Sequence, residues 1–98
     1  MCEKILHYNI VPTQYEKNTS VTVDKQCNGF VAKNTGNTLM NIMGEYLQPG
    51  ESKSIGGNRA EIFIGKVDIF FTGPSLIPAQ PTAVTACVVT QKVYTDLL

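Results

Sequence analysis

The side chains that most often catalyse reactions or bind metals are few in this chain and widely spaced. The single histidine is His7, and the three cysteines are Cys2, Cys27 and Cys87. A general base needs a partner within hydrogen-bonding reach, and no nucleophile motif accompanies His7 in the sequence. No two cysteines have the Cys-x-x-Cys spacing that is typical of zinc and redox sites. We therefore predict no catalytic, metal-binding or cofactor-binding residue, and we expect that the chain is not an enzyme.

The cysteine count also bears on the cellular compartment. Three is an odd number, so the cysteines cannot all pair within one chain. Free thiols in a reducing compartment are the simpler interpretation than a disulfide framework. Residues 1–10 lack the pattern of a signal peptide because Glu3, Lys4 and His7 interrupt the apolar residues. Synthesis in a cytoplasm is the expectation that follows.

Three other patterns could bind a ligand. Gly56-Gly57-Asn58 and Gly65-Lys66 contain glycines of the kind found in phosphate loops. Neither fits a P-loop, which needs Gly-Lys-Ser/Thr between a strand and a helix. The tyrosines could together form a sugar-binding platform, although scattered tyrosines are more simply residues at the edge of a core. The four tyrosines are Tyr8, Tyr15, Tyr46 and Tyr94.

Composition excludes two classes of partner. The formal net charge is zero, from 8 basic and 8 acidic residues, whereas general nucleic-acid binding depends on a basic surface. No apolar run approaches the ~20 residues that a membrane-spanning helix requires. Zero net charge also gives little electrostatic protection against self-association. We expect no nucleic-acid partner and no membrane partner.

Turn sequences divide the chain into short runs of strand-forming residues. Asn28-Gly29 is expected to form a two-residue hairpin turn, and Pro49-Gly50 a type II turn. Further turns are expected at 34–37 and 56–58, and the polar residues 13–20 are expected to form a loop. Strands are expected at 4–11, 20–24, 30–33, 39–43, 52–55, 61–71 and 83–94. This pattern predicts an all-β fold of about eight short antiparallel strands in a single domain, 1–98, arranged as a β-sandwich or a small barrel.

Alternation along these strands predicts which side chains are buried. Leu6, Tyr8 and Ile10 form the better candidate for the buried face of the first strand. Pro12 is expected to end that strand or to place it at a sheet edge, and 52–55 is expected to be a solvated edge strand. Apolar residues on both faces of 39–43 indicate that it is covered on both sides. Val21 and Val23 are expected to be buried.

The segment 61–71 is the most apolar strand of the chain. Phe63, Val67, Ile69 and Phe71 share one parity and are expected to dominate the core, with Gly65 as the site of a bulge or a close backbone approach. A second packing surface, which another subunit could cover, is predicted by the apolar residues of the other parity: Ile62, Ile64 and Phe70. The proline-rich segment 73–81 is expected to be an extended connector, which either crosses between sheets or lies on a partner.

The turn layout resembles a known group of proteins. The segments that carry the resemblance are Phe30–Thr38, Leu47–Ser52, Ser54–Asn58 and Glu61, which include Asn-Thr-Gly, Pro-Gly-Glu-Ser and Gly-Gly-Asn. They resemble short virion proteins of tailed bacteriophages, especially of crAss-like phages, over roughly the middle third of the chain. The resemblance implies a capsid-bound head-fibre, auxiliary or decoration protein, with no catalytic residues to transfer.

The leading hypothesis is therefore a non-enzymatic structural virion protein. Its partners would be other virion proteins, such as the major capsid protein or a fibre protein, and a homo-oligomer is expected. It would be made in the host cytoplasm and reside in the virion. The alternative is a small carbohydrate- or peptide-binding β-sandwich, which predicts an exposed aromatic cluster. An enzyme would instead need titratable groups that converge around His7.

Overall fold

The computed structural model is all-β and describes residues 8–57, 62 and 65–95. These residues form eight strands and no helix, which confirms the predicted fold class. The strands are β1 (Tyr8–Tyr15), β2 (Thr19–Thr22), β3 (Cys27–Asn34), β4 (Leu39–Ile42), β5 (Glu45–Leu47), β6 (Ser52–Gly56), β7 (Lys66–Thr72) and β8 (Cys87–Tyr94).

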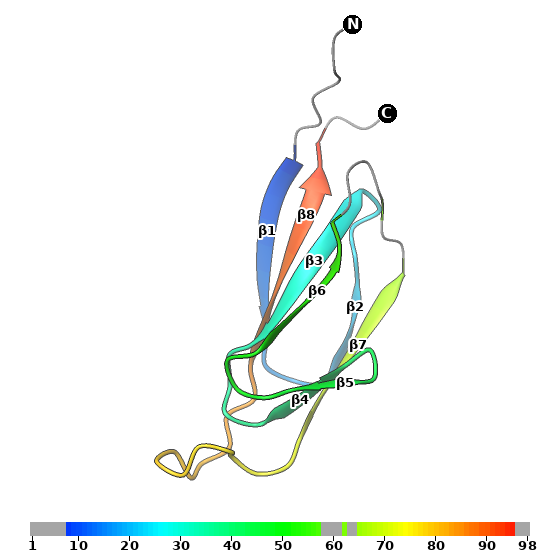
Figure 1. Ribbon diagram of the computed structural model, residues 1–98. Helices are drawn as coiled ribbons and strands as arrows, with labels where there is room; N and C mark the ends of the chain where they lie inside the picture. Colours follow the sequence, from blue (N-terminus) through cyan, green and yellow to red (C-terminus); the bar gives the residue numbers. More distant parts are fainter. Residues whose placement is uncertain (1–7, 58–61, 63–64, 96–98) are drawn as a thin grey trace, which may run out of the picture.

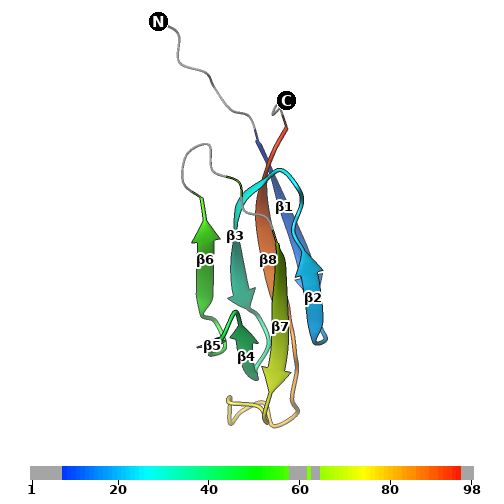
Figure 2. The ribbon, with the colours of Figure 1, turned by 90° about the vertical axis from the view of Figure 1, so that its right-hand side faces the viewer.

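The strands make two antiparallel sheets that pack face to face (Figures 1 and 2). The first sheet has the order β1-β8-β3-β6, and the second sheet has the order β2-β7-β4-β5. Each sheet has four strands and two open edges. The architecture is therefore the sandwich rather than the barrel of the two predicted alternatives.

The pairing follows a single rule along the chain. β1 pairs with β8, β2 with β7, β3 with β6 and β4 with β5, as if the chain were one long hairpin. The pair β3–β8 then completes the first sheet, and the pair β4–β7 completes the second sheet. Of the seven connections between consecutive strands, only β4–β5 stays within one sheet. This wrapping of eight strands is the topology of a jelly roll.

The core lies between the two sheets and comes from alternate residues of the strands. Val21, Val23, Val67 and Ile69 are buried as predicted, and Phe71 packs against them at the margin. Burying one large apolar side chain contributes about 1.5–3 kcal/mol. The other members of the cluster are Cys27, Phe30, Ala32, Met40, Ile42, Leu47, Cys87 and Val89.

A buried asparagine ties together one end of the sandwich. The Asn34 Nδ2 donates to the Thr38 carbonyl at 2.8 Å and to the Leu47 carbonyl at 2.9 Å, while its Oδ1 accepts from the Gly36 backbone N at 3.2 Å. These bonds connect the end of β3 to the start of β4 and to β5. They also form the turn that the sequence predicts at 34–37.

A second asparagine holds the long β7–β8 connection. The Asn37 Nδ2 donates to the Thr82 carbonyl at 2.9 Å, and its Oδ1 accepts from the Val84 backbone N at 2.6 Å. Its carbonyl accepts from the Leu76 backbone N at 2.7 Å. The proline-rich segment 73–81 contains no strand and leads from the second sheet to the first (Figure 1). It therefore crosses between sheets.

The predictions for the first strand are partly wrong. Tyr8 and Ile10 are 47% and 57% exposed, because Ile10 lies opposite Lys92 on the outer face of the first sheet. Leu6 lies outside the described residues. Pro12 does place the strand at an edge, but β1 continues to Tyr15. The predicted loop at 13–20 is consequently shorter, since its two ends belong to β1 and β2.

The predicted hairpin turn at Asn28-Gly29 is also wrong, because both residues lie inside β3. A Cβ atom on Gly29 would lie 2.5 Å from the Gly57 backbone N and 2.5 Å from the Ile55 carbonyl oxygen. Glycine is required here because the β6 backbone approaches β3 closely. The physical need is space rather than a positive φ.

The middle of the chain follows the predictions more closely. β6 is an edge strand, and the Glu51 backbone N donates to the Gln48 carbonyl at 2.9 Å across the Pro49-Gly50 turn, where Gly50 has a φ of 87°. β4 is covered less than predicted, since its inward residues are fully buried while Met43, just beyond it, is 47% exposed.

The last two strands begin later than predicted, at Lys66 and at Cys87. Gly65 immediately precedes β7 and has a φ of 148°. Phe63 and Ile64 lie outside the described residues. Ile62 and Phe70 are 40% and 47% exposed, so two of the three residues assigned to a second packing surface do lie at the surface.

Candidate functional site

The residues with catalytic or metal-binding chemistry do not gather in the described part of the chain. His7 and Cys2 lie outside the described residues. Cys27 and Cys87 are free and fully buried. Among residues 8–57, 62 and 65–95, no three His, Cys, Asp or Glu side chains are placed to hold a metal ion.

The two buried thiols act as packing residues. The Cys27 Sγ donates to the Gly29 carbonyl at 3.2 Å, and both sulfur atoms belong to the core cluster. Burial raises the pKa of the Cys27 thiol and of the Cys87 thiol above the ordinary value of 9.0. Because the thiolate is the reactive form, neither cysteine is suited to nucleophilic chemistry.

The raised pKa values predict that stability falls at alkaline pH. The unfolded thiols ionise as the pH rises past 9.0, while the folded thiols stay protonated, so the unfolded state binds fewer protons and the free energy of unfolding decreases. Urea titrations between pH 8 and 10 should show this loss. The double variant Cys27→Ala/Cys87→Ala should show a shallower loss, and an equal slope in both proteins would contradict the prediction.

The glycine backbone that could bind a ligand is already hydrogen-bonded, and the tyrosines lie in different parts of the fold. The Gly57 backbone N donates to the Asn28 carbonyl at 3.2 Å, so it pairs with β3. Tyr94 is buried, and Tyr8 lies on the first sheet, with the Lys92 Nζ 4.1 Å from its ring centroid. Tyr46 lies on the second sheet. The four tyrosines, all within the described residues, therefore do not form one platform.

Strand register instead gathers a different set of side chains on the outer face of the second sheet. Asn41 of β4 lies opposite Tyr46 of β5 on one side and opposite Phe70 of β7 on the other. Directly opposed residues of antiparallel strands point to the same face. Tyr46 is 62% and Phe70 is 47% exposed. Two aromatic residues therefore flank an asparagine on this face, with their backbones about 9.5 Å apart across two strand spacings.

Two more apolar residues extend this row. Leu39, half-buried, shares the outward parity of Asn41 on β4, and the exposed Met43 follows β4 in the turn to β5. We call these five residues, Leu39, Asn41, Met43, Tyr46 and Phe70, the aromatic patch. Tyrosine, phenylalanine and methionine are enriched in the centres of protein interfaces. Sequence reasoning identified Phe70 but missed Tyr46, because only the pairing of β4 with both neighbours brings them together.

The outer face of the first sheet is hollow where two glycines pair. Gly29 lies opposite Gly56 of β6 and opposite Lys92 of β8, and Lys92 lies opposite Ile10 of β1. An almost wholly apolar groove of about 190 Å³ lies at this point. We call it the glycine groove. Its lining residues are Ile10, Asn28, Gly29, Phe30, Val31, Ile55, Gly56, Gly57, Thr90 and Lys92.

Register also places charged side chains on both outer faces. Register places Lys33 and Lys92 on the outer face of the first sheet, and the described strand residues of that face include no acid. On the second sheet, Lys66 and Asp68 share the outward parity of Phe70, and Asp68 accepts a hydrogen bond from the Ser20 hydroxyl. The Asp68 carboxylate is therefore the charged group of β7 nearest to Phe70 along the strand, and the Lys92 ammonium lines the glycine groove.

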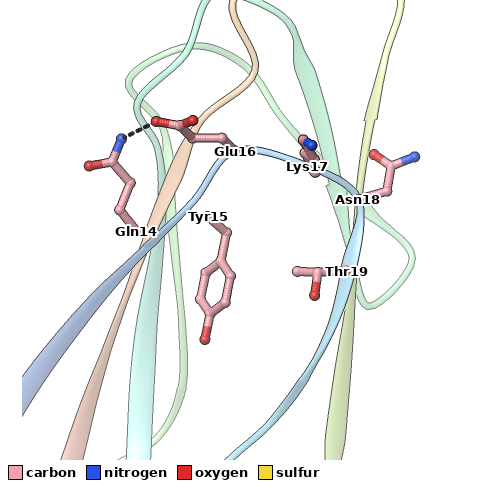
Figure 3. Close-up of a pocket in the computed structure, with 6 residues that line it drawn as sticks. All are labelled: Gln14, Tyr15, Glu16, Lys17, Asn18 and Thr19. Carbon is pink, nitrogen blue, oxygen red and sulfur yellow. Dashed lines mark hydrogen bonds between the residues drawn. The ribbon is translucent and has the colours of Figure 1, made fainter.

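A second hollow lies at the β1–β2 turn (Figure 3). It has a volume of about 530 Å³ and is lined by six consecutive residues, 14–19. The Tyr15 ring points into it, and the Asn18 Oδ1 accepts from the Phe71 backbone N at 2.8 Å. Because a single turn supplies the whole lining and Asn18 holds β7, we interpret this hollow as a feature of the turn.

Comparisons with protein-family models, with curated proteins and with solved structures found no match for this chain. Within the described part of the chain, no helix is long and apolar enough to cross a membrane. The two outer faces of the sandwich are therefore the candidate functional surfaces.

Proposed function

We propose that this chain is a non-enzymatic structural protein of a phage virion, bound to the capsid as a head-fibre, auxiliary or decoration protein. The observation that carries the proposal is the aromatic patch on the open face of a jelly roll. Viral capsid proteins are among the proteins built on this topology, so the fold supplies an analogy for the role. The resemblance of the turn sequences to phage virion proteins also favours a virion role.

The mechanism would be burial of the aromatic patch against another virion protein, with no chemical turnover. Tyr46 and Phe70 would supply most of the binding energy, since a few large central side chains usually dominate an interface. The Asn41 amide between them would pair with a polar group of the partner and fix its orientation. The major capsid protein or a fibre protein would be the partner, met in the host cytoplasm during assembly.

Co-sedimentation with purified capsids of the parent virion tests this proposal. Phe70→Ser removes a ring that is 47% exposed and should weaken binding about 30-fold, as expected for a central interface residue worth about 2 kcal/mol. Leu76→Ser is a matched control, because Leu76 is also 47% exposed but lies in the β7–β8 connection. Absence of wild-type binding, or equal binding by both variants, would contradict the proposal.

A second candidate function is binding of a neutral oligosaccharide at the same patch. It is favoured by the amide held between two exposed aromatic rings, since rings stack on sugars and amides bond to hydroxyl groups. Jelly rolls also occur among lectins. The apolar side chains of Leu39 and Met43 beside the row fit a protein surface better. A glycan array with wild-type protein and Phe70→Ser would decide, since sugar binding predicts hits that the variant loses.

A further inference from the structure

The two outer faces of the sandwich have opposite shapes. The second sheet presents exposed rings, Tyr46 and Phe70, and the first sheet presents the apolar glycine groove. A cavity of about 150 Å³ lined by apolar side chains is large enough for benzene. The groove, at about 190 Å³, therefore has room for one phenyl ring.

We propose that copies of this chain stack head to tail, with the aromatic patch of one copy seated on the glycine groove of the next. Phe70 would enter the groove between Ile10 and Val31, which are 57% and 41% exposed. The inference deepens the proposed structural role by naming a second copy as an occupant of the patch. Its evidence is the two faces themselves and does not depend on the virion.

The charges support this pairing over a dimer of two first sheets. Lys92 lines the groove, and Asp68 lies two residues before Phe70 on the same outward face. A head-to-tail contact brings this ammonium and this carboxylate to the same interface. Pairing of two first sheets would instead bring Lys33 and Lys92 against their own copies, and like charges at an interface disfavour association.

The symmetry of the contact predicts the kind of assembly. Patch and groove lie on opposite faces of one molecule, so each contact leaves a free patch at one end and a free groove at the other. Such heterologous contacts continue into a filament or close into a ring. In a fibre, the first copy would place its patch on the capsid, and each later copy would place its patch on the groove beneath it.

A mixing experiment tests this arrangement. Phe70→Ser loses the patch but keeps the groove, and Val31→Lys loses the groove but keeps the patch. By sedimentation velocity, the wild type should grow beyond a dimer as concentration rises, and each variant alone should remain monomeric, with self-association at least tenfold weaker. An equimolar mixture of the two variants should form a heterodimer and stop there. Leu76→Ser should assemble like the wild type.

Three results would overturn the proposal: a wild type that is monomeric at every concentration, a variant that still self-associates like the wild type, or a mixture without heterodimer. If Val31→Lys does not fold by circular dichroism, Ile10→Lys blocks the same groove from β1. The virion role fails separately. A chain that binds capsids but never stacks refutes only the stacking, and a chain that stacks but ignores capsids refutes only the virion role.

Discussion

Replacement of Asn34 with alanine is expected to lower the free energy of unfolding by about 3–5 kcal/mol, since it strips buried backbone groups of their partners. The side chain makes three hydrogen bonds, to the Thr38 and Leu47 carbonyls and from the Gly36 backbone N. A domain of this size has a total stability of about 5–15 kcal/mol. The substitution therefore removes a large share of it. Equilibrium unfolding in urea measures the change.

Two further variants isolate the cause. Asn9→Ala removes an exposed asparagine of β1 and should change stability by less than about 0.5 kcal/mol. Asn34→Asp keeps the shape but replaces the donating Nδ2 with an oxygen, which would face two carbonyl oxygens. It should be at least as destabilising as Asn34→Ala at neutral pH. If Asn34→Ala were no worse than Asn9→Ala, the assigned role of Asn34 would be wrong.

Replacement of Gly29 with alanine is expected to cost about 3 kcal/mol, at the upper end of the usual range for overpacking. The new Cβ would lie 2.5 Å from two backbone atoms, the Gly57 N and the Ile55 carbonyl oxygen. Backbone atoms of a paired strand cannot rotate away as a side chain can. The β3–β6 pairing must therefore open locally, and thermal unfolding should show a lower midpoint.

Gly44→Ala is the matched control for this substitution. Gly44 has a φ of 82°, and a Cβ there would meet nothing within 4 Å. Gly44→Ala should lower the free energy of unfolding by about 1 kcal/mol, which is the cost of a left-handed backbone at alanine. The comparison separates lack of space from backbone conformation. A smaller loss for Gly29→Ala than for Gly44→Ala would show that β6 does not press on β3 as the structure describes.

Much of the fold could be predicted because turn chemistry is local. Pro49-Gly50 fixes its own backbone angles, and the strands on either side then have little freedom in direction. The alternation at Val67 and Ile69 likewise reports burial directly, since one face of β7 meets the other sheet. These features depend on neighbouring residues alone, so the sequence is sufficient to read them.

The errors arose where distant strands decide the outcome. Asn28-Gly29 has the residues of a hairpin turn, but β6 and β8 pair on either side of it and extend the strand through it. Tyr8 and Ile10 alternate like core residues, yet β1 lies at an edge with Ile10 on the outer face. Apolar alternation shows which residues share a face of the strand, but it does not show whether another element covers that face.

The candidate surfaces were the least accessible from sequence. Phe70 was recognisable as a surplus apolar residue, but Tyr46 is 24 positions away and joins it only through β4. The glycine groove likewise requires the register that sets Gly29 opposite Gly56. Both surfaces are products of cross-strand pairing. Local patterns could therefore indicate that a second packing surface exists, but they could not identify the residues that form it.

The most direct test of the account is the mass that capsids gain when saturated with the groove-blocked variant Val31→Lys. This variant keeps the aromatic patch and should not stack, so each binding position on the capsid should hold one copy. We predict a plateau at a fixed number of copies per capsid, measured by light scattering. A capsid that gains no mass, although the variant is folded, would contradict the claim that the patch binds a virion protein.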